Sequence, residues 1–545
     1  MDRATLGAQL READFPAMVP PFESSSYVEN QASTKAVWPT TANASAFPVP
    51  GAPGVPGVPQ GIRPPMIRPL LLLFLAVIII DSVGNNTLPL IDRDEPRFAE
   101  ASREMRQTGD FLIPRVNGEY RFDKPPLIYW CQVGSTLLLG ESDFSVRLPS
   151  VLFAAATAVL TALWGARLYG RKIGLWAGII FGTCLQLFIH GRAAVADMPM
   201  VCFFLCSTWI AWERTGNPRS RLLWLGFYVS LALGFLAKGP IALLPMLFPA
   251  IFYLSQKRRF SLHAGSALLG LAIFVLIVGA WGIPALIATK GEFFAIGIGR
   301  HVVMRSVAPM QSHGANGLIG YCLSLPFYLV TILFSFFPWC IYLPNALSRL
   351  RRGIDLPERY LLGGVVLVFL VFTLIQTKLP HYTLPAFPLL AILIARSVPP
   401  AGAARALAAA AVALYLLIAF AGFAFVAPYF PSKTAYESVK PSLGSQTQVA
   451  FVSYDEQSLI WYFRYSVNPF LVHVSPSEVV HFMNSSPSAV SVVTRADLEQ
   501  ISVDPAWKQT QIKGFDFSRW KLRRSDLLPF PFVLPEPTDL VVLAR

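Results

Sequence analysis

Charge is scarce in this chain, and its scarcity indicates the class of protein. Of the 545 residues only 14% are Asp, Glu, Lys or Arg, whereas 54% are hydrophobic and the mean hydropathy is +0.50. Several apolar runs approach the length of a membrane span, and the charges are confined between them, a pattern that a soluble chain with a large core would not repeat. The sequence therefore predicts a polytopic α-helical membrane protein with about 11–13 transmembrane helices.

The chain also lacks the patterns of several other classes. It has no basic stripe with interleaved aromatic residues, so the net charge of +13 does not indicate a nucleic-acid partner. None of its six cysteines forms a CxxC pair, and none lies in residues 428–545, so that region relies on its core rather than on disulfides. Cys202 and Cys206 are one helical turn apart, but buried membrane cysteines are a better interpretation than a metal pair.

Composition divides the chain into three regions. Residues 1–66 are polar and then rich in Pro, Gly and Ser; because no basic segment leads into an apolar core, they are predicted to be a disordered cytoplasmic tail rather than a signal peptide. Residues 67–427 hold the apolar runs and form the predicted transmembrane catalytic domain. Basic residues fall in alternate loops, which the positive-inside rule places in the cytoplasm. The outer loop 91–147 and, for an odd number of spans, residues 428–545 then lie outside.

In residues 428–545, short β-branched runs alternate with helical patterns, which predicts a small periplasmic α/β domain. It has no Gly-rich phosphate loop and no catalytic triad pattern, so its expected role is structural or in contacting a substrate. Short β-branched runs cover 448–453, 470–474 and 489–494, and helical patterns cover 455–462, 476–484 and 495–501.

One stretch departs from the general scarcity of charge. Residues 92–124 contain eight acidic and seven basic residues directly after the first apolar run. Pro96 follows Asp94 and Glu95, and Gly109 comes at a suitable stop, which predicts a short amphipathic helix that lies flat in the membrane interface. A solvated loop with ordinary ion pairs is the alternative.

Further polar residues fall in the other loops predicted to face outward. Alone, each is more typical of an interfacial anchor or a lysine that extends to the membrane surface. Together they place cations and a few carboxylates on one side of the membrane, which suits an anionic lipid headgroup and a carboxylate that acts as a base or positions a sugar donor. They are His190, Arg192, Asp197, Lys238, His301, Arg305, His313, Lys378, His381 and Tyr382.

A series of short motifs runs through residues 66–400 in a consistent order. They read DEPRFAE, GDFLIPRVNGEYRFDKPPLIYW, SVRLPS, RAAVADMPM, LAKGP, RHVVMRS followed by SHG, and KLPHYTLP. The series resembles the bacterial family of lipid-linked-sugar glycosyltransferases that includes the aminoarabinose transferase of lipid A and is related to protein O-mannosyltransferases. The resemblance implies a GT-C membrane fold with periplasmic juxtamembrane helices, and a polyprenyl-phosphate sugar donor used at the periplasmic face of the inner membrane.

The resemblance also implies roles for individual residues. Asp94 matches the carboxylate of the family's Asp-Glu motif, expected to act as a base or an orienting group, and Glu95 and Arg97 are its motif neighbours. Lys124 in FDKPP matches the lysine expected to contact the donor phosphate. Further expected substrate contacts are Arg305, Lys378 and Tyr382, and further polar contacts are Asp123, His301, His313 and His381.

The chemistry of the transfer agrees with these roles. A polyprenyl phosphate leaving group needs cations such as Lys124 and Arg305 to stabilise the charge that develops on its bridging oxygen. An attacking hydroxyl would need a base such as Asp94, whereas a lipid phosphate is already ionised and would need positioning only. Inversion at the anomeric carbon is expected from the resemblance.

The resulting prediction is a hexosyl- or pentosyltransferase that moves a sugar to a lipid or envelope-glycan acceptor similar to lipid A, with membrane lipids as further partners. The alternatives are a protein O-glycosyltransferase and a transporter or flippase of lipid-linked saccharides. A transporter should carry charges near mid-membrane and internal repeats, whereas this chain concentrates its charges at one face. The sequence requires no cofactor. A divalent metal is compatible with the convergence of Asp, Glu and His, but no ligand spacing demands one.

Overall fold

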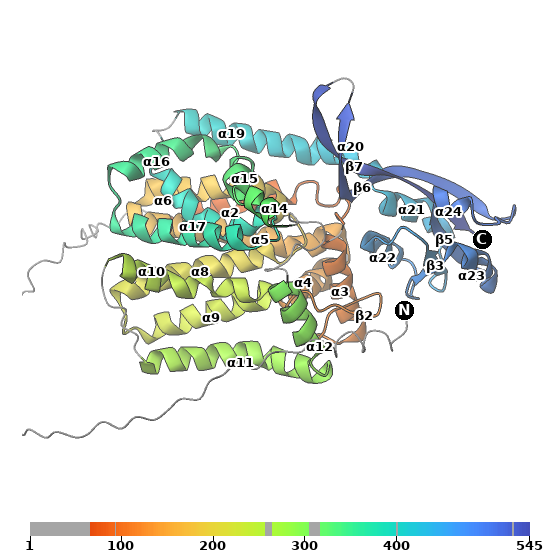
Figure 1. The fold of residues 1–545 in the computed structure, drawn as a ribbon, viewed down its shortest axis with the longest axis horizontal. Coiled ribbons are helices and arrows are strands. Elements are labelled where there is room, and N and C mark those ends of the chain that lie inside the picture. Colours follow the sequence, from red (N-terminus) through yellow and green to blue (C-terminus); the bar gives the residue numbers. More distant parts are fainter. Residues whose placement is uncertain (1–65, 93, 257–263, 305–316, 399–401, 526–527) are drawn as a thin grey trace, which may run out of the picture. The chain divides into compact units, whose positions relative to one another are not determined.

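The structure is a computed structural model that describes residues 66–545, with gaps at 93, 257–263, 305–316, 399–401 and 526–527 (Figure 1). The predicted tail over 1–66 lies outside the described residues except for Met66. The described chain contains a helical part that ends at Tyr429 and an α/β part that begins at Pro431.

The helical part consists of α-helices interrupted by short 3₁₀ and π segments. Proline contributes to the interruptions because it lacks an N–H group and its ring clashes with the preceding turn. Pro240 and Pro245 lie in the 3₁₀ segment η1, and Pro380 and Pro385 lie in the 3₁₀ segment η4. The elements are α2 (Ile67–Ser82), α3 (Glu95–Thr108), α4 (Leu127–Leu139), α5 (Asp143–Tyr169), α6 (Arg171–Gly182), α7 (Leu185–Gly191), α8 (Asp197–Gly216), α9 (Arg221–Lys238), η1 (Pro240–Met246), α10 (Leu247–Ser255), α11 (Ala264–Ala288), α12 (Glu292–Phe294), η2 (Ala295–Met304), α14 (Gly317–Ser324), α15 (Phe327–Ser335), η3 (Trp339–Tyr342), α16 (Leu343–Arg352), α17 (Leu356–Leu374), η4 (Pro380–Ala386), α18 (Phe387–Ala395), α19 (Gly402–Leu417), η5 (Ile418–Gly422), α20 (Phe423–Val426) and η6 (Ala427–Tyr429).

Within the described residues, five helices are long and apolar enough to cross a membrane, and two bent pairs of helices raise the number to seven. The chain is thus a multi-pass membrane protein, as expected. The total of about 11–13 spans stays a prediction, because a span broken by proline does not form one long helix. The long helices are Asp143–Tyr169, Arg221–Lys238, Gly265–Ala288, Leu356–Leu374 and Gly402–Tyr429; shorter apolar helices are Leu127–Leu139, Pro240–Leu254 and Pro380–Ala395.

The interior of the helical part is built from α5, α6, α8, α17 and α18. Every residue of α18 is buried, and small residues let neighbouring helices approach closely. A Cβ atom on Gly174 of α6 would lie 2.3 Å from the carbonyl oxygen of Ala162 in α5, so only glycine fits there. In contrast, only 11% of the apolar window of α11 is buried, as expected for a helix that faces lipid.

The charged stretch 92–124 forms α3 and a small hairpin of β1 (Arg115–Val116) and β2 (Glu119–Tyr120). As the sequence predicts, α3 has Pro96 in its first turn and ends at Gly109, whose φ of 72° suits glycine. However, α3 is not the exposed interfacial helix that its pattern predicts. Every side chain from Glu95 to Met105 except Arg97 is buried, because α4 covers one side of the helix and the α/β part covers another.

The α/β part contains a five-stranded sheet in the order β4-β3-β5-β7-β6. β3 pairs in parallel with β4 and β5, and β7 pairs antiparallel with β5 and with β6. The three predicted strands and the three helical segments between them are observed, whereas the long β6–β7 hairpin was not predicted. The elements are α21 (Pro431–Val439), η7 (Lys440–Ser442), β3 (Gln448–Phe451), α22 (Gln457–Phe463), β4 (Val472–His473), η8 (Pro476–Glu478), α23 (Val479–Ser485), β5 (Ala489–Thr494), α24 (Arg495–Leu498), β6 (Lys508–Ser525) and β7 (Leu528–Ala544).

Helix α22 holds the α/β part against the start of the helical part. The Trp461 indole and the Tyr462 hydroxyl donate to the two carboxylate oxygens of Asp143, the first residue of α5, at 2.9 and 3.0 Å. Arg103 of α3 donates to the Trp461 carbonyl at 2.9 Å and stacks on its ring at 3.8 Å. The backbone N–H of Ser458 donates to Asp92 at 2.9 Å. These contacts join α22 to α3, to the start of α5 and to the loop before α3.

Candidate functional site

A cavity of about 430 Å³ lies beside the start of α3, and we call it the large cavity. Phe188, Ile418 and Phe423 contribute to an apolar side of its lining. A cavity of this size that combines apolar walls with converging polar groups is typical of a ligand-binding site. Its polar lining residues are Asp92, Asp94, Glu95, Arg147, His190, Arg192, Asp197 and His381.

Asp94, the predicted catalytic carboxylate, lines the large cavity from the position just before α3. Its side chain is exposed and makes no capping hydrogen bond to the helix. The N-terminal end of a helix favours a negative charge, so this position suits an ionised carboxylate. Asp94 is also near enough to act electrostatically on His190 and on Tyr129. A ligand in the cavity can therefore reach the Asp94 carboxylate.

Glu95, the second predicted catalytic residue, is engaged by the protein itself. Both of its carboxylate oxygens accept from Arg147, at 2.8 and 2.7 Å, and the backbone N–H groups of Ile91 and Ala194 donate to it at 2.9 and 2.8 Å. Burial opposes ionisation of Glu95, but Arg147 and the two N–H groups outweigh burial and lower its pKa. This geometry favours a positioning role for Glu95, which fixes the start of α3 beside Asp94.

Lys124 lines a second cavity of about 60 Å³, which we call the small cavity. Its ammonium donates to the carbonyl of Asp123 at 3.1 Å, and Asp123 lies 3.8 Å from Arg121. Lys238 lines the same cavity, so two lysine side chains border one small space. Paired cations of this kind suit a phosphate group.

The ion pair between Lys238 and Asp197 joins the two cavities. Lys238 lines the small cavity and Asp197 lines the large one, and their charged atoms are 2.5 Å apart. The His381 Nε2 atom lies 3.9 Å from the same Asp197 oxygen, and the His381 ring is 4.6 Å from that of His190. The charge of Lys124 also acts on His381. The predicted carboxylate and the predicted phosphate-contacting lysine are thus connected through these residues.

The remaining predicted residues have other positions. Lys378 is buried, and its ammonium donates to three backbone carbonyls at the end of α17, which favours a structural role. The Tyr382 ring lies 5.9 Å from the Lys238 ammonium. Arg97 is half-buried on α3 and is not among the lining residues of either described cavity. The side chain of His301 and all of Arg305 and His313 lie outside the described residues.

Arg147 was not singled out in the sequence, and four other residues of the site were expected on the outer side without an individual role. Arg147, His190, Arg192, Asp197 and Lys238 all line one of the two cavities. A signal for them is present in the motifs SVRLPS, HGRAAVAD and LAKGP, where charged residues interrupt apolar sequence. Which of these charges meet in space depends on helix packing, which one sequence does not provide.

Comparisons with known proteins agree with this architecture. The family model for dolichyl-phosphate-mannose-protein mannosyltransferase matches residues 123–283. An undecaprenyl phosphate-alpha-4-amino-4-deoxy-L-arabinose arabinosyl transferase 2 of Sodalis glossinidius is 34% identical over 314 residues, 56% of this chain and 54% of that protein. A corresponding transferase of an Enterobacter species is 32% identical over 316 residues, with the same coverage. The chain thus spans about half the length of these curated relatives.

Two further relatives are matched over a larger share of their own length. An uncharacterized protein of Aquifex aeolicus is 30% identical over 331 residues, 60% of this chain and 73% of that protein. The crystal structure of ArnT from Cupriavidus metallidurans bound to undecaprenyl phosphate has a TM-score of 0.66 and 17% identity, covering 87% of this chain and 97% of that one. The apo structure of the same protein also has a TM-score of 0.66. The chain therefore has the GT-C membrane fold and belongs to one family with the Aquifex aeolicus protein, and about half of its length is similar to the curated arabinosyl transferases.

Proposed function

We propose that this chain transfers a sugar from a polyprenyl-phosphate donor to a lipid or envelope-glycan acceptor at the periplasmic face of the inner membrane. The observation that carries the proposal is the pairing of an accessible carboxylate, Asp94, with a small cavity bordered by the side chains of Lys124 and Lys238. The names of the curated relatives and the undecaprenyl phosphate bound to the similar ArnT structure support it.

In this proposal the donor phosphate binds at Lys124 and Lys238. The bond between the anomeric carbon and the phosphate oxygen breaks, and its electron pair stays on the polyprenyl phosphate, where the two cations stabilise the charge. The acceptor oxygen forms the new bond to the anomeric carbon. A hydroxyl acceptor gives its proton to Asp94, whereas an ionised phosphate acceptor has none to give, and Asp94 then orients it.

The test is sugar transfer by purified variants with an undecaprenyl-phosphate-linked sugar and a lipid A-type acceptor. Asp94→Asn and Lys124→Ala should fold and lose transfer. Matched controls are Glu119→Gln, an exposed acid in the same charged stretch, and Lys440→Ala, an exposed lysine of the α/β part; both should retain it. Full activity of Asp94→Asn or Lys124→Ala would refute these two assignments.

A protein acceptor is the second candidate, because the matching family model is that of a protein mannosyltransferase. A secreted acceptor protein that carries sugar only in cells with the active chain would favour this candidate. Loss of a sugar from the envelope lipids in cells without the gene, detected by mass spectrometry, would favour the lipid acceptor instead.

A further inference from the structure

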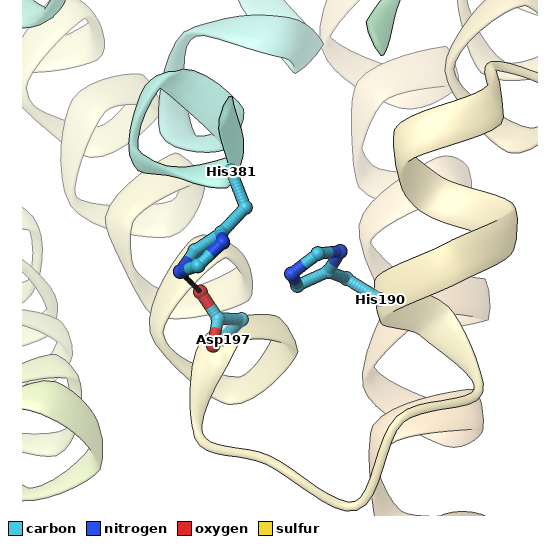
Figure 2. Close-up of side chains that lie close together, drawn as sticks. All are labelled: His190, Asp197 and His381. Atoms are coloured by element: carbon cyan, nitrogen blue, oxygen red, sulfur yellow. Dashed lines mark ion pairs between the residues drawn. The ribbon is translucent and has the colours of Figure 1, made fainter. Parts of the chain in front are cut away.

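Three side chains with metal-binding atoms meet where the large cavity borders the Lys238–Asp197 ion pair (Figure 2). His190 comes from the end of α7, Asp197 is the first residue of α8, and His381 lies on η4. One ligand atom from each lies within 4.8 Å of the other two. Zinc binds nitrogen and oxygen at about 2.0–2.2 Å, so its ligand atoms are roughly 3.3 Å apart and small side-chain movements would complete such a site.

The surroundings of His190 orient its ring for this role. The Gln186 side chain, one turn earlier on α7, lies 2.8 Å from the Nδ1 atom of His190, so the Nε2 atom is the one left for a metal. A hydrogen bond from the second ring nitrogen of a histidine to a neighbouring group is the usual support of a metal ligand, because it fixes the tautomer and the ring orientation. The Gln186 atom placed there is the amide nitrogen, and turning the amide by 180° brings its oxygen to the same place, where it accepts from Nδ1–H.

Lys238 is the group that a metal would have to replace. Its ammonium now neutralises Asp197 from 2.5 Å, so a divalent ion and Lys238 compete for one carboxylate. The Lys238 side chain also lines the small cavity, which offers its ammonium a place beside Lys124 when it leaves Asp197. A phosphate bound in that cavity would stabilise the displaced ammonium.

We propose that His190, Asp197 and His381 bind one divalent transition-metal ion, which replaces the Lys238 ammonium as the partner of Asp197. Two imidazoles and one carboxylate favour Zn²⁺, Mn²⁺, Fe²⁺ or Co²⁺ over Mg²⁺ and Ca²⁺, which prefer oxygen ligands. The site goes beyond the proposed sugar transfer and does not depend on it. His190 and His381 are separated by 190 residues, which explains why no motif spacing reveals the site.

The experiment uses the full chain, purified in detergent, stripped with a chelator and dialysed. Co²⁺ is titrated while its visible absorption is recorded, and Zn²⁺ binding is measured by calorimetry, with metal content checked by mass spectrometry. We expect one ion per chain, bound at least about tenfold more weakly by His190→Ala and His381→Ala, since losing even an outer partner of a metal ligand costs 10–100-fold. Lys238→Met should bind the ion more tightly, because the competing ammonium is gone.

His481→Ala, which removes an exposed histidine of the α/β part, is the matched control and should bind like the wild type. His190→Gln and His381→Gln, which keep most of the side-chain volume, replace any alanine variant that misfolds. Three results would each overturn the inference: no stoichiometric binding by the wild type, unchanged affinity in both histidine variants, or no gain in affinity in Lys238→Met. Metal binding without sugar transfer would refute the proposed function alone.

Discussion

Replacing Arg147 with methionine should destabilise the protein by about 3–5 kcal/mol, because removal of one partner of a buried ion pair leaves the other charge uncompensated. The Arg147 guanidinium is buried, and besides its two bonds to Glu95 it donates to the carbonyls of Asn85, Leu88 and Pro89 at 2.7, 2.6 and 2.9 Å. Methionine fills much of the same volume but donates to none of these groups. The loop between α2 and α3 therefore loses its anchor together with Glu95.

The chain offers a matched control in the pair Arg167–Glu213. Arg167 also donates two hydrogen bonds to a glutamate, but its side chain is 63% exposed, compared with 2% for Arg147. Arg167→Met should cost at most about 1 kcal/mol, because exposed ion pairs contribute little. For a chain of this size the entropy of unfolding is about 1 kcal/mol/K, so the thermal midpoint should fall by about 3–5 °C for Arg147→Met and by about 1 °C or less for the control.

The midpoint can be followed with a fluorophore that reacts with thiols, because Cys184 and Cys202 are buried and become accessible on unfolding. Equal effects of Arg147→Met and Arg167→Met would refute the reasoning. The double variant Glu95→Gln/Arg147→Met should be less destabilised than the sum of the two single variants, since no buried charge is left unpaired. Glu95→Gln should lose stability and transfer together, whereas Asp94→Asn should lose transfer at an unchanged midpoint. Loss of transfer by Glu95→Gln without loss of stability would assign Glu95 a catalytic role instead.

Three further predictions concern other parts of the structure. Burial and the neighbouring Glu456 raise the pKa of Asp92 to about 8, against the effect of the hydrogen bonds from Ser458. The protonated Asp92 side chain therefore contributes stability that is full below the ordinary pKa of 3.8 and is lost as the pH rises through about 8. The thermal midpoint should fall between pH 6 and pH 9, and it should fall less in Asp92→Asn. Trp461→Ala should detach the α/β part from α3, measured as faster proteolysis at residues 428–545, whereas Val472→Ala, at an exposed side chain of β4 in the same part, should not. Lys378→Met should lower the thermal midpoint and leave the KM for the donor nearly unchanged. Lys124→Met should raise the KM for the donor and leave the thermal midpoint nearly unchanged.

Local features of the sequence predicted much of the fold. Pro96 and Gly109 delimit α3 because their backbone requirements are local, and the β-branched runs of the α/β part form the expected strands β3, β4 and β5. Missing from the prediction was the β6–β7 hairpin. Pro529, Pro531, Pro535 and Pro537 interrupt the strand pattern of β7, and proline is compatible with a strand only where the N–H group it lacks is not needed for pairing.

Contacts between distant segments account for what the sequence could not predict about the site. Glu95 and Arg147 belong to different motifs, and only the packing of α3 against α5 makes them partners. Lys378 is of a residue type that binds phosphate, but its ammonium donates to backbone carbonyls at the C-terminal end of α17 instead. The amino-acid types therefore predicted that the charged residues lie on one side of the membrane, and the packing of the helices determines which of them are available to a ligand.

The concentration of charge in 92–124 has a physical reason once the partners of these residues are known. A chain poor in charge buries Glu95, Glu100 and Arg103 on one short helix, which is stable only because each meets an opposite charge. The Glu95–Arg147 pair ties α3 to α5 within the helical part, and Arg103 donates to the Trp461 carbonyl of α22, so the helix is held from two sides. Under the proposed function such rigidity has a use, because a displacement of about 1 Å at a reacting group can cost 100-fold in rate. The buried charges would then act on catalysis indirectly, by fixing Asp94 at the start of a helix that cannot shift.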